Sequence, residues 1–200
     1  MLGPRPSPLP EYRERELGYT PPMHQRIVVL GCSGSGKTTL ARQLAAALDV
    51  PMLELDAVHW KPNWTSSTAE EMTPIIARHI AQPAWTVDGN YGKVRDMILS
   101  RADTIIWLDY SLGVVLWRVA TRTFRRCWTG EELWAGNREN FWMQVATKDS
   151  IFVWVLGVWR KRRAEYPKLL PMQKARGKRV YRFRKPKETA KWLAAVTARV

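Results

Sequence analysis

One stretch of eight residues constrains this chain more than any other. Residues 31–38 read Gly-Cys-Ser-Gly-Ser-Gly-Lys-Thr, a full match to the phosphate-binding pattern in which two glycines separated by four residues precede Lys and Ser or Thr. The apolar run 26–30 precedes it, and Leu40, Leu44 and Leu48 recur at helical spacing after it. Strand, glycine-rich loop and helix in this order predict a loop whose backbone N–H groups bind phosphate at the positive end of a helix.

The residue types in the loop indicate which phosphates it binds. Lys37 is expected to reach the β- and γ-phosphates and the Thr38 hydroxyl to ligate Mg²⁺. We therefore expect ATP and Mg²⁺ as cofactors. The alternative is a glycine-rich turn before an ordinary helix, which needs neither Lys37 nor Thr38. The residues expected to bind the nucleotide are Gly31, Cys32, Ser33, Gly34, Ser35, Gly36, Lys37, Thr38 and Thr39.

The chain-wide composition limits the class of protein. Two hundred residues with 46% hydrophobic content are enough for one globular domain with a sizeable core. Two cysteines cannot form a disulfide framework, and Cys32 lies inside the phosphate loop, so a reducing compartment is expected. The longest apolar run, 151–159, is too short to span a bilayer, and no apolar signal core is present. We expect a cytoplasmic protein without a membrane partner, a monomer or a weak dimer.

The first 24 residues differ in composition from the rest. They hold six of the thirteen prolines, and their three Arg balance three Glu. We expect residues 1–24 to be a flexible, proline-rich extension and residues 25–200 to be the functional domain.

Apolar runs and helical patterns alternate through the domain. Besides 26–30, strands are predicted at 51–56, 83–88, 103–109 and 178–183, and the stretches between them have helical periodicity. Such alternation is typical of an α/β fold in which helices cover both faces of a parallel sheet. The predicted helices are 39–48, 68–80, 92–99, one from 112 to about 128, 137–147, 150–165, 168–175 and 188–200.

Two prolines complicate the helix predictions. In the helix 68–80, Thr68 and Glu71 have the spacing of a capping box, but Pro74 either kinks this helix or marks its true start with Thr73 as the cap. Pro167 is expected to stop the helix that begins near residue 150.

Two acidic residues end predicted strands that flank the first strand. Asp88 and Asp109 are both candidates to hold Mg²⁺. We favour Asp88 because Gly89 and Asn90 after it give a loop that allows close approach, and we list Thr38 and Asp88 as the metal site. The alternative for either carboxylate is a cap at the strand end.

Asp56 ends the predicted strand 51–56, on the side where an acceptor would lie. A carboxylate there can orient an acceptor hydroxyl and accept its proton, or contact a sugar or base if the acceptor is a phosphate. The alternative is a loop-capping role. The nearby His59 lies between aromatic residues, where an imidazole is more often structural.

The helix from residue 112 carries four arginines whose spacing lets three share one face. Arginines on a closing lid would stabilise the charge of a transferred phosphoryl group and exclude water, so we place Arg118, Arg122 and Arg126 with Lys37 and Asp56 in the catalytic set. The alternative is a solvated basic face. The predicted helical lid covers about 118–165.

These motifs together resemble a known family. The chain is similar to the adenylate-kinase-like P-loop kinases, and within them to a small bacterial branch labelled DNA topology modulation proteins. The resemblance covers about residues 25–195 and rests on the stretches 31–40, 55–64, 85–91 and 102–118. It implies a three-layer P-loop NTPase fold, a five-stranded parallel sheet of order 2-3-1-4-5, a mobile lid and phosphoryl transfer from ATP.

The resemblance also has consequences for the two substrates. In such kinases the loop after the fifth strand holds the adenine, which implies that Arg184 contacts the nucleotide. Nucleoside monophosphate kinases have Asp-Gly-Phe-Pro-Arg after the third strand, whereas this chain has Asp-Gly-Asn-Tyr-Gly at 88–92. The arginine that would clamp a monophosphate is absent at that position, with Arg95 as a possible substitute. We therefore expect a small-molecule or nucleotide kinase whose acceptor is open.

A second function remains an alternative. The formal charge is +14, and residues 158–187 contain thirteen basic residues and one acid. A basic segment of this kind attracts polyanions, so a nucleotide-regulated ATPase that binds nucleic acid through its C-terminal third is possible. No helix with the pattern of a DNA-reading element is present, so the kinase is favoured.

Overall fold

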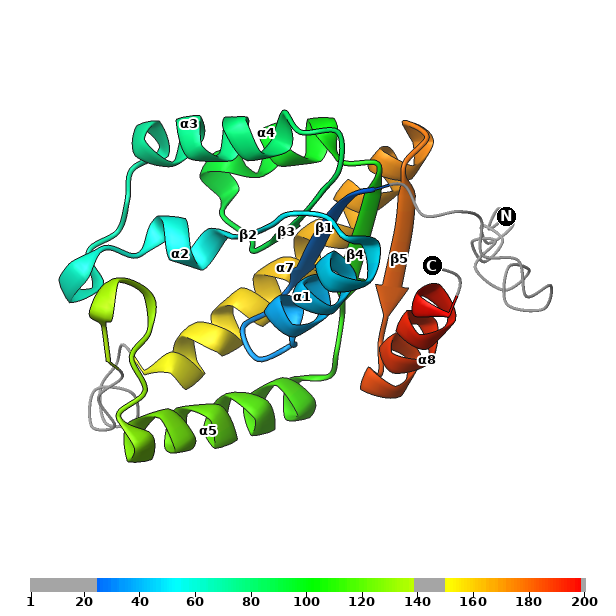
Figure 1. Cartoon of the computed structure of the whole chain (residues 1–200). Helices are drawn as coiled ribbons and strands as arrows, with labels where there is room; N and C mark the ends of the chain where they lie inside the picture. Colours follow the sequence, from blue (N-terminus) through cyan, green and yellow to red (C-terminus); the bar gives the residue numbers. More distant parts are fainter. Residues whose placement is uncertain (1–24, 139–149, 199–200) are drawn as a thin grey trace, which may run out of the picture.

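The computed structural model describes residues 25–138 and 150–198. Its centre is a five-stranded sheet of order β2-β3-β1-β4-β5 in which every pairing is parallel, so the predicted α/β class and strand order are confirmed (Figure 1). The expected extension 1–24 lies outside the described residues. The strands are β1 Arg26–Gly31, β2 Met52–Glu54, β3 Trp85–Asp88, β4 Thr104–Leu108 and β5 Arg179–Phe183.

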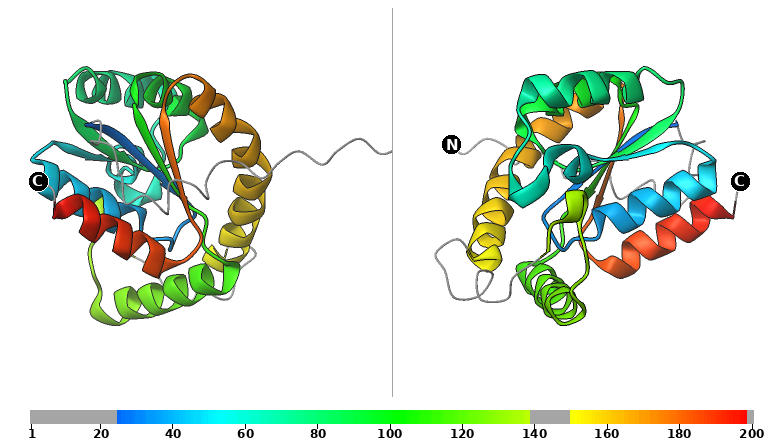
Figure 2. Two further views of the ribbon diagram at one scale, coloured as in Figure 1. Left: turned by 90° about the vertical axis from the view of Figure 1, so that its right-hand side faces the viewer. Right: turned by 60° about the vertical axis from the view of Figure 1, so that its left-hand side comes forward.

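Helices cover both faces of this sheet and produce three layers. One face carries α1 and α8, and the other carries α3, α4 and the long α7 (Figures 1 and 2). The core follows from the alternation along β1: Ile27 and Val29 pack with α1, whereas Val28 and Leu30 pack with α3 and α4. These helices are α1 Lys37–Leu48, α3 Ala69–Ile80, α4 Gly92–Arg101, α7 Ile151–Ala175 and α8 Pro186–Thr197.

The remaining elements gather at the carboxyl ends of the strands. The helix α5 runs across this end of the sheet (Figure 1). It is amphipathic, and it ends where Gly130 adopts the left-handed conformation with φ 62°. Open parallel sheets bind ligands at this end. The elements are α2 Leu55–His59, η2 Pro62–Trp64, α5 Leu112–Thr129 and η3 Trp134–Gly136.

The cap of α3 shows whether this helix begins at Thr68 or, as the alternative prediction had it, at Thr73 before Pro74. Thr68 accepts a hydrogen bond from the Glu71 N–H, and the Glu71 side chain accepts one from the Thr68 N–H, which completes the predicted capping box. The helix continues through Pro74, so Thr73 is not the cap.

The prediction that Pro167 stops a helix is wrong. A single helix, α7, replaces the two predicted stretches 150–165 and 168–175, and it contains both Pro167 and Pro171. Both prolines are exposed, so water can bond the carbonyls that lose an N–H partner, while Tyr166 and Leu170 on the opposite face are buried against the sheet.

Two further predictions change near the site. The strand that was predicted to reach Asp56 ends at Glu54, and Asp56 lies in the first turn of the short helix α2. In the predicted helix 137–147, Asn137 and Arg138 are not helical, because Arg138 pairs with Glu132 in an antiparallel bridge. The rest of that predicted helix lies outside the described residues.

Candidate active site

The phosphate loop connects β1 to α1 as predicted, and two of its glycines have left-handed backbone conformations. Gly36, with φ 90°, is the N-cap of α1, and Gly34 has φ 78°. A Cβ on Gly34 would lie 2.6 Å from Val119 Cγ2 and 2.9 Å from the Val115 carbonyl oxygen. Only glycine therefore lets the loop pack this closely against α5.

The Cys32 carbonyl oxygen is the hydrogen-bonding centre of the loop. It accepts hydrogen bonds from Ser35 N at 3.1 Å, from Ser35 Oγ at 2.7 Å and from Lys37 Nζ at 3.2 Å. The Cys32 thiol is buried and donates to the Val155 carbonyl oxygen at 3.6 Å. The ammonium group of Lys37 is thus held at the loop, from which it can turn to a phosphate.

A cavity of about 1240 Å³ lies over this loop. It extends from the loop to the end of β2 and to α2 on one side, and to α5, residues 131–134 and α8 on the others, so residues that are far apart in the sequence share one space. Among the predicted site residues, those that line it are Ser33, Gly34, Ser35, Gly36, Lys37, Thr38, Thr39, Asp56, Arg118, Arg122 and Arg126.

Three predicted nucleotide-binding residues do not line this cavity. Gly31 ends β1 as the sheet partner of Leu108, and Cys32 is buried. Arg184 is exposed, and its backbone N–H donates to Glu188 Oε2 at 2.9 Å. In the segment after β5, it is Pro186 that lines the cavity.

The residues predicted to hold Mg²⁺ are brought together. Thr38 Oγ1 donates to Asp88 Oδ2 at 2.5 Å, and Asp88 Oδ1 is buried without a hydrogen-bond partner among the described residues. Burial raises the pKa of the Asp88 carboxyl, which the hydrogen bond from Thr38 and the charge of Lys37 oppose. Oxygen ligands of this kind suit Mg²⁺, which binds proteins through one or two such groups together with phosphate oxygens and water.

Asp109 has a different environment from Asp88. Its carboxylate is buried and accepts hydrogen bonds from Arg163 Nε at 2.8 Å and Arg182 Nη2 at 2.6 Å. Arg182 also lies over the Trp107 ring, 4.4 Å from its centroid. Asp109 therefore joins α7 to β5 by ion pairs.

On α2, Asp56 is held by an aromatic neighbour. Tyr91 Oη donates to Asp56 Oδ1 at 2.5 Å, and burial together with Asp56 raises the pKa of Tyr91, so this hydroxyl keeps its proton. The His59 ring lies 4.2 Å from that of Tyr91, centroid to centroid. Burial lowers the pKa of His59, while Asp56 opposes that shift.

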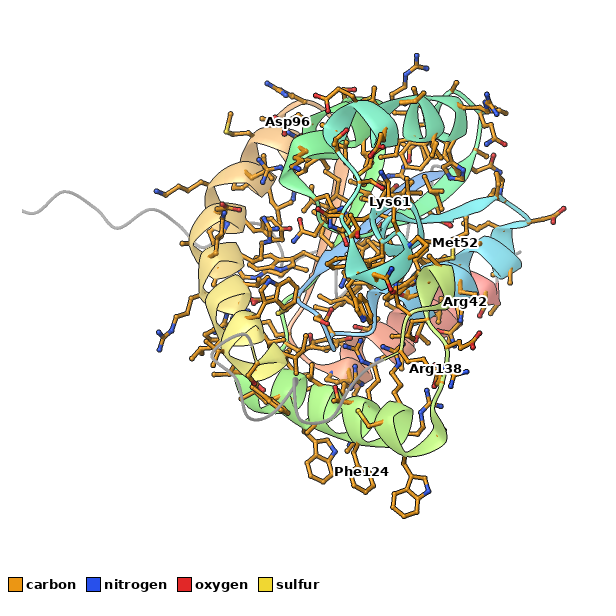
Figure 3. All side chains as sticks on the ribbon, turned by 90° about the vertical axis from the view of Figure 1, so that its left-hand side faces the viewer. Arg42, Met52, Lys61, Asp96, Phe124 and Arg138 are labelled. Carbon is orange, nitrogen blue, oxygen red and sulfur yellow. The ribbon has the colours of Figure 1, made fainter. Side chains whose placement is uncertain are left out.

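The arginines of α5 contact the phosphate loop directly. Arg118 Nη1 donates to the Ser35 carbonyl oxygen at 3.1 Å, and Arg122 Nη2 donates to Ser33 Oγ at 3.2 Å. On the other face of α5 the side chains are apolar and exposed, and Phe124 points away from the rest of the molecule (Figure 3). The two faces of the helix thus separate clearly, and the basic one faces the cavity.

Two other α5 arginines are paired with an acid. Arg125 and Arg126 lie 2.8 and 3.6 Å from Glu131. Arg126 was predicted to be catalytic, and it lines the cavity in this paired arrangement.

A short segment after α5, residues 131–138, which we call the tip segment, lies against the segment 60–66 that follows α2. Both contain a tight turn with left-handed residues, Asn63 and Trp64 in one and Ala135 and Gly136 in the other. In the first turn residue 61 donates its N–H to the carbonyl of residue 65, and in the second residue 133 donates to 137.

Asn137 joins the two turns. Its Oδ1 accepts from Trp64 N at 2.9 Å, and its Nδ2 donates to the carbonyl oxygens of Lys61 and Trp134, both at 2.8 Å. Lys61 and Arg138, labelled in Figure 3, lie on these two segments. Asn137 is 5% exposed, so these hydrogen bonds are made away from bulk water.

Glu54 is a cavity residue that sequence reasoning missed. It is the Cα partner of Asp88 in the sheet, lies 3.9 Å from Arg42 and hydrogen-bonds Trp134 of the tip segment. Burial raises the pKa of Glu54, and the charges of Asp88 and Asp56 add to the effect. A charged residue in the apolar run 52–55 was the signal that could have found it. Trp134 and Asn137 have no such local signal.

Comparisons with known proteins concern the fold and the part of the chain that contains the phosphate loop. Residues 27–109, from β1 to the end of β4, match the family described as ATPase family associated with various cellular activities (AAA). The matched residues include the phosphate loop at 31–38 and the strand-end acid Asp88. No curated protein sequence matches the chain significantly.

Among solved structures, two similar ones are small kinases. A gluconokinase from Sinorhizobium meliloti 1021 aligns with a TM-score of 0.51 and 19% identity over 89% of this chain and 92% of its own. A shikimate kinase from Bacteroides thetaiotaomicron aligns with a TM-score of 0.53 and 14% identity over 86% and 96%. The fold is that of the small P-loop kinases. At these identities the likeness concerns the fold alone.

The length and apolar character of the helices decide whether one of them can cross a membrane. Within residues 25–138 and 150–198, every helix is too short or too polar to cross a bilayer.

Proposed function

We propose that the protein is an ATP- and Mg²⁺-dependent phosphotransferase that transfers the γ-phosphoryl group of ATP to a small acceptor. The observation that carries the proposal is the shared cavity. The phosphate loop, Arg118 and Arg122 lie at one end of it, and Asp56 lies on a separate wall. A protein that only hydrolyses ATP needs no second wall of this kind.

The residues have distinct roles in this proposal. Lys37 leaves the Cys32 carbonyl and contacts the β- and γ-phosphates, while the loop N–H groups bind the β-phosphate. Arg118 and Arg122 stabilise charge on the transferred group. Thr38 and Asp88 would hold Mg²⁺, which supplies charge neutralisation at the phosphates when bound.

Asp56 acts on the acceptor side. Its Oδ1 is held by the Tyr91 hydroxyl, so the carboxylate has a fixed orientation and its Oδ2 faces no donor within the described ranges. That oxygen orients the acceptor hydroxyl and takes its proton. The narrower resemblance, to the branch labelled DNA topology modulation proteins, stays a prediction.

Nucleic-acid binding is the less supported alternative. Part of the basic segment 158–187 makes internal contacts: Arg162 donates to the Asn90 carbonyl oxygen at 2.8 Å, and Arg163 and Arg182 pair with Asp109. Lys178 donates to the Leu99 carbonyl oxygen. These side chains stabilise the domain, so less of the charge is available to a polyanion.

The test compares the wild type with Lys37→Ala and with Lys174→Ala, which removes an exposed lysine near the end of α7. ADP release with ATP and Mg²⁺ is measured across nucleosides, nucleoside monophosphates, sugars and small acids. We expect an acceptor to raise ADP release in the wild type and in Lys174→Ala, and Lys37→Ala to lose about a hundred- to a thousandfold of that rate. Full activity in Lys37→Ala would disprove the proposal.

A further inference from the structure

The cavity has two ends of opposite charge. At the loop end, Lys37, Arg118 and Arg122 surround the place of the phosphates. At the other end, Glu54 and Asp56 line the wall. An acceptor must therefore fit against carboxylates while its reacting oxygen faces a cluster of cations.

The two carboxylates retain most of their capacity to accept hydrogen bonds. Asp56 is bonded by Tyr91 through one oxygen. Glu54 is bonded by Trp134 and has Arg42 at 3.9 Å, but the Arg42 side chain is 70% exposed, so solvent screens that pair. An ionised carboxylate is an acceptor only, so hydroxyl or ammonium groups of a ligand would satisfy the remaining lone pairs.

A third carboxylate, that of Asp88, lies next to Glu54 in the sheet but does not line the cavity. Asp88, which is the sheet partner of Glu54, is 1% exposed and keeps one oxygen without a hydrogen bond among the residues described. An anion at this wall would be repelled by Glu54 and Asp56, whereas the free oxygen of Asp88 is the one assigned above to Mg²⁺.

Most basic side chains that could bind an anionic acceptor have acidic or backbone partners among the described residues. Arg95, the candidate to clamp an acceptor phosphate, does not line the cavity, and it lies 3.3 Å from Asp96 and 3.6 Å from Glu165. Arg125 and Arg126 are paired with Glu131. Arg118 and Arg122 donate to the phosphate loop, and Arg42, whose side chain is largely exposed, lies 3.9 Å from Glu54.

Trp134 adds a surface of a different kind to this wall. It lines the cavity beside Glu54, and Asn137 fixes its segment against residues 60–66. An indole offers a flat apolar surface to ring carbons and an attractive face to cations. Carboxylates together with such a surface suit a ring or chain that carries many hydroxyl groups.

We infer that the acceptor is a neutral or cationic polyol, a sugar or amino sugar by chemical class, whose hydroxyl and ammonium groups donate to Glu54 and Asp56. The inference rests on the proposed phosphotransferase function. In the transfer, a hydroxyl oxygen forms a bond to the γ-phosphorus as the bond from that phosphorus to the β–γ bridging oxygen breaks. The hydroxyl proton passes to Asp56, and ADP leaves with the bond's electron pair.

The experiment uses matched six-carbon probes on the full chain with ATP and Mg²⁺. D-glucosamine is cationic, D-glucose neutral and D-gluconate anionic, and a panel of other sugars with their amino and acid forms extends the series. Phosphorylated product is quantified by mass spectrometry. We expect kcat/KM for the amino or neutral form to exceed that for the acid form at least tenfold.

Two substitutions test whether the carboxylates of the acceptor wall cause the preference for amino or neutral sugars over sugar acids. Glu54→Gln keeps the size of the side chain and removes its charge, so the ratio of amino form to acid form should fall at least fivefold. Glu70→Gln makes the same change on the exposed first turn of α3 and should leave the ratio unchanged. The thermal shift caused by ATP should be the same in both variants and the wild type, which shows that the nucleotide end is intact.

Preference for the acid form would overturn the inference, as would transfer to no neutral or cationic polyol. Either result leaves the phosphotransferase function standing if another acceptor gives Lys37-dependent ADP release. An unchanged ratio in Glu54→Gln would equally contradict the role of this wall.

Discussion

The two ends of the cavity are built in different ways. At the phosphate end, most of the groups come from eight consecutive residues, and their geometry is set by the left-handed conformations of Gly34 and Gly36. At the acceptor end, the groups come from β2, α2 and the tip segment, which are joined by hydrogen bonds between residues more than 70 positions apart, such as that from Trp64 to Asn137. The phosphate loop, as a local motif, can keep the same phosphate chemistry. The distant contacts of the acceptor end can change, and with them the acceptor that binds, without any change in the loop.

The largest effect should come from replacing Asp88, and Asp109 is the matched acid with which we compare it. In Asp88→Asn, we expect the rate of transfer to fall about a thousandfold, because the carboxylate beside Thr38 is lost. Asp109→Asn should retain most activity but lower the free energy of unfolding by about 2 kcal/mol, because Arg163 and Arg182 lose a buried partner. Steady-state kinetics and urea denaturation of both variants measure these effects.

The pH dependence of folding stability should further distinguish Asp88 from Asp109. The folded pKa of Asp88 is raised above its unfolded value, so the folded state binds more protons between the two values and stability of the ligand-free protein falls as the pH rises through them. Asp88→Asn should therefore have a higher Tm than the wild type at pH 7 without ATP. A lower Tm for this variant at pH 7 would show that the Asp88 charge stabilises the fold.

The next effect concerns the arginines that connect α5 to the loop. Arg122→Ala should lower kcat about a hundredfold, because the guanidinium next to Ser33 is positioned for the transferred group. Arg125→Ala on the same helix removes a 65% exposed side chain and should change kcat less than threefold. Equal losses in the two variants would mean that α5 contributes only general positive charge.

Close packing of the loop on α5 can be tested at a glycine. Gly34→Ala should destabilise the fold by about 2 kcal/mol, because a Cβ there would overlap Val119 in a backbone conformation that side chains rarely adopt. Gly113 lies on α5, and a Cβ there meets open space, so Gly113→Ala should stabilise the fold slightly. Thermal unfolding separates the two outcomes, and an unchanged Tm in Gly34→Ala would contradict this packing.

The smallest effect should appear at the acceptor end. Asn137→Ala removes the hydrogen bonds that join the tip segment to residues 60–66, so we expect KM for the acceptor to rise about tenfold while KM for ATP stays constant. Arg138→Ala loses only an exposed pair with Glu132 and serves as the control. A rise in both KM values would indicate that the whole cavity, including its nucleotide end, depends on this contact.

The difference between the two ends also explains what the sequence could predict. The resemblance to the P-loop kinases implies the sheet order, which the structure confirms. The phosphate loop follows from an apolar run and a motif, and Thr38 and Asp88, chosen from that motif and a strand end, lie within hydrogen-bond distance of each other. Asp56 lines the cavity from a helix and not from a strand end, because the strand β2 stops two residues earlier, at Glu54.

Residues such as Trp134 and Asn137 could not be found in this way. Asn137 lies in a stretch with helical periodicity, and its role depends on a turn 73 residues away that presents Trp64 N and the Lys61 carbonyl. Periodicity reports which face of an element is buried, and it carries no information on which distant turn that element meets. The error at Pro167 has the same origin, since Tyr166 and Leu170 bind α7 to the sheet strongly enough to continue the helix.

The central claim is that both ends of the cavity serve one reaction, and the stoichiometry of that reaction tests it most directly. With ATP, Mg²⁺ and the best acceptor, ADP and phosphorylated acceptor are quantified together by ³¹P NMR, with Lys37→Ala as the blank. The account predicts equal amounts of ADP and phosphorylated acceptor and almost no inorganic phosphate. ADP accompanied by inorganic phosphate alone, with every acceptor tested, would contradict it.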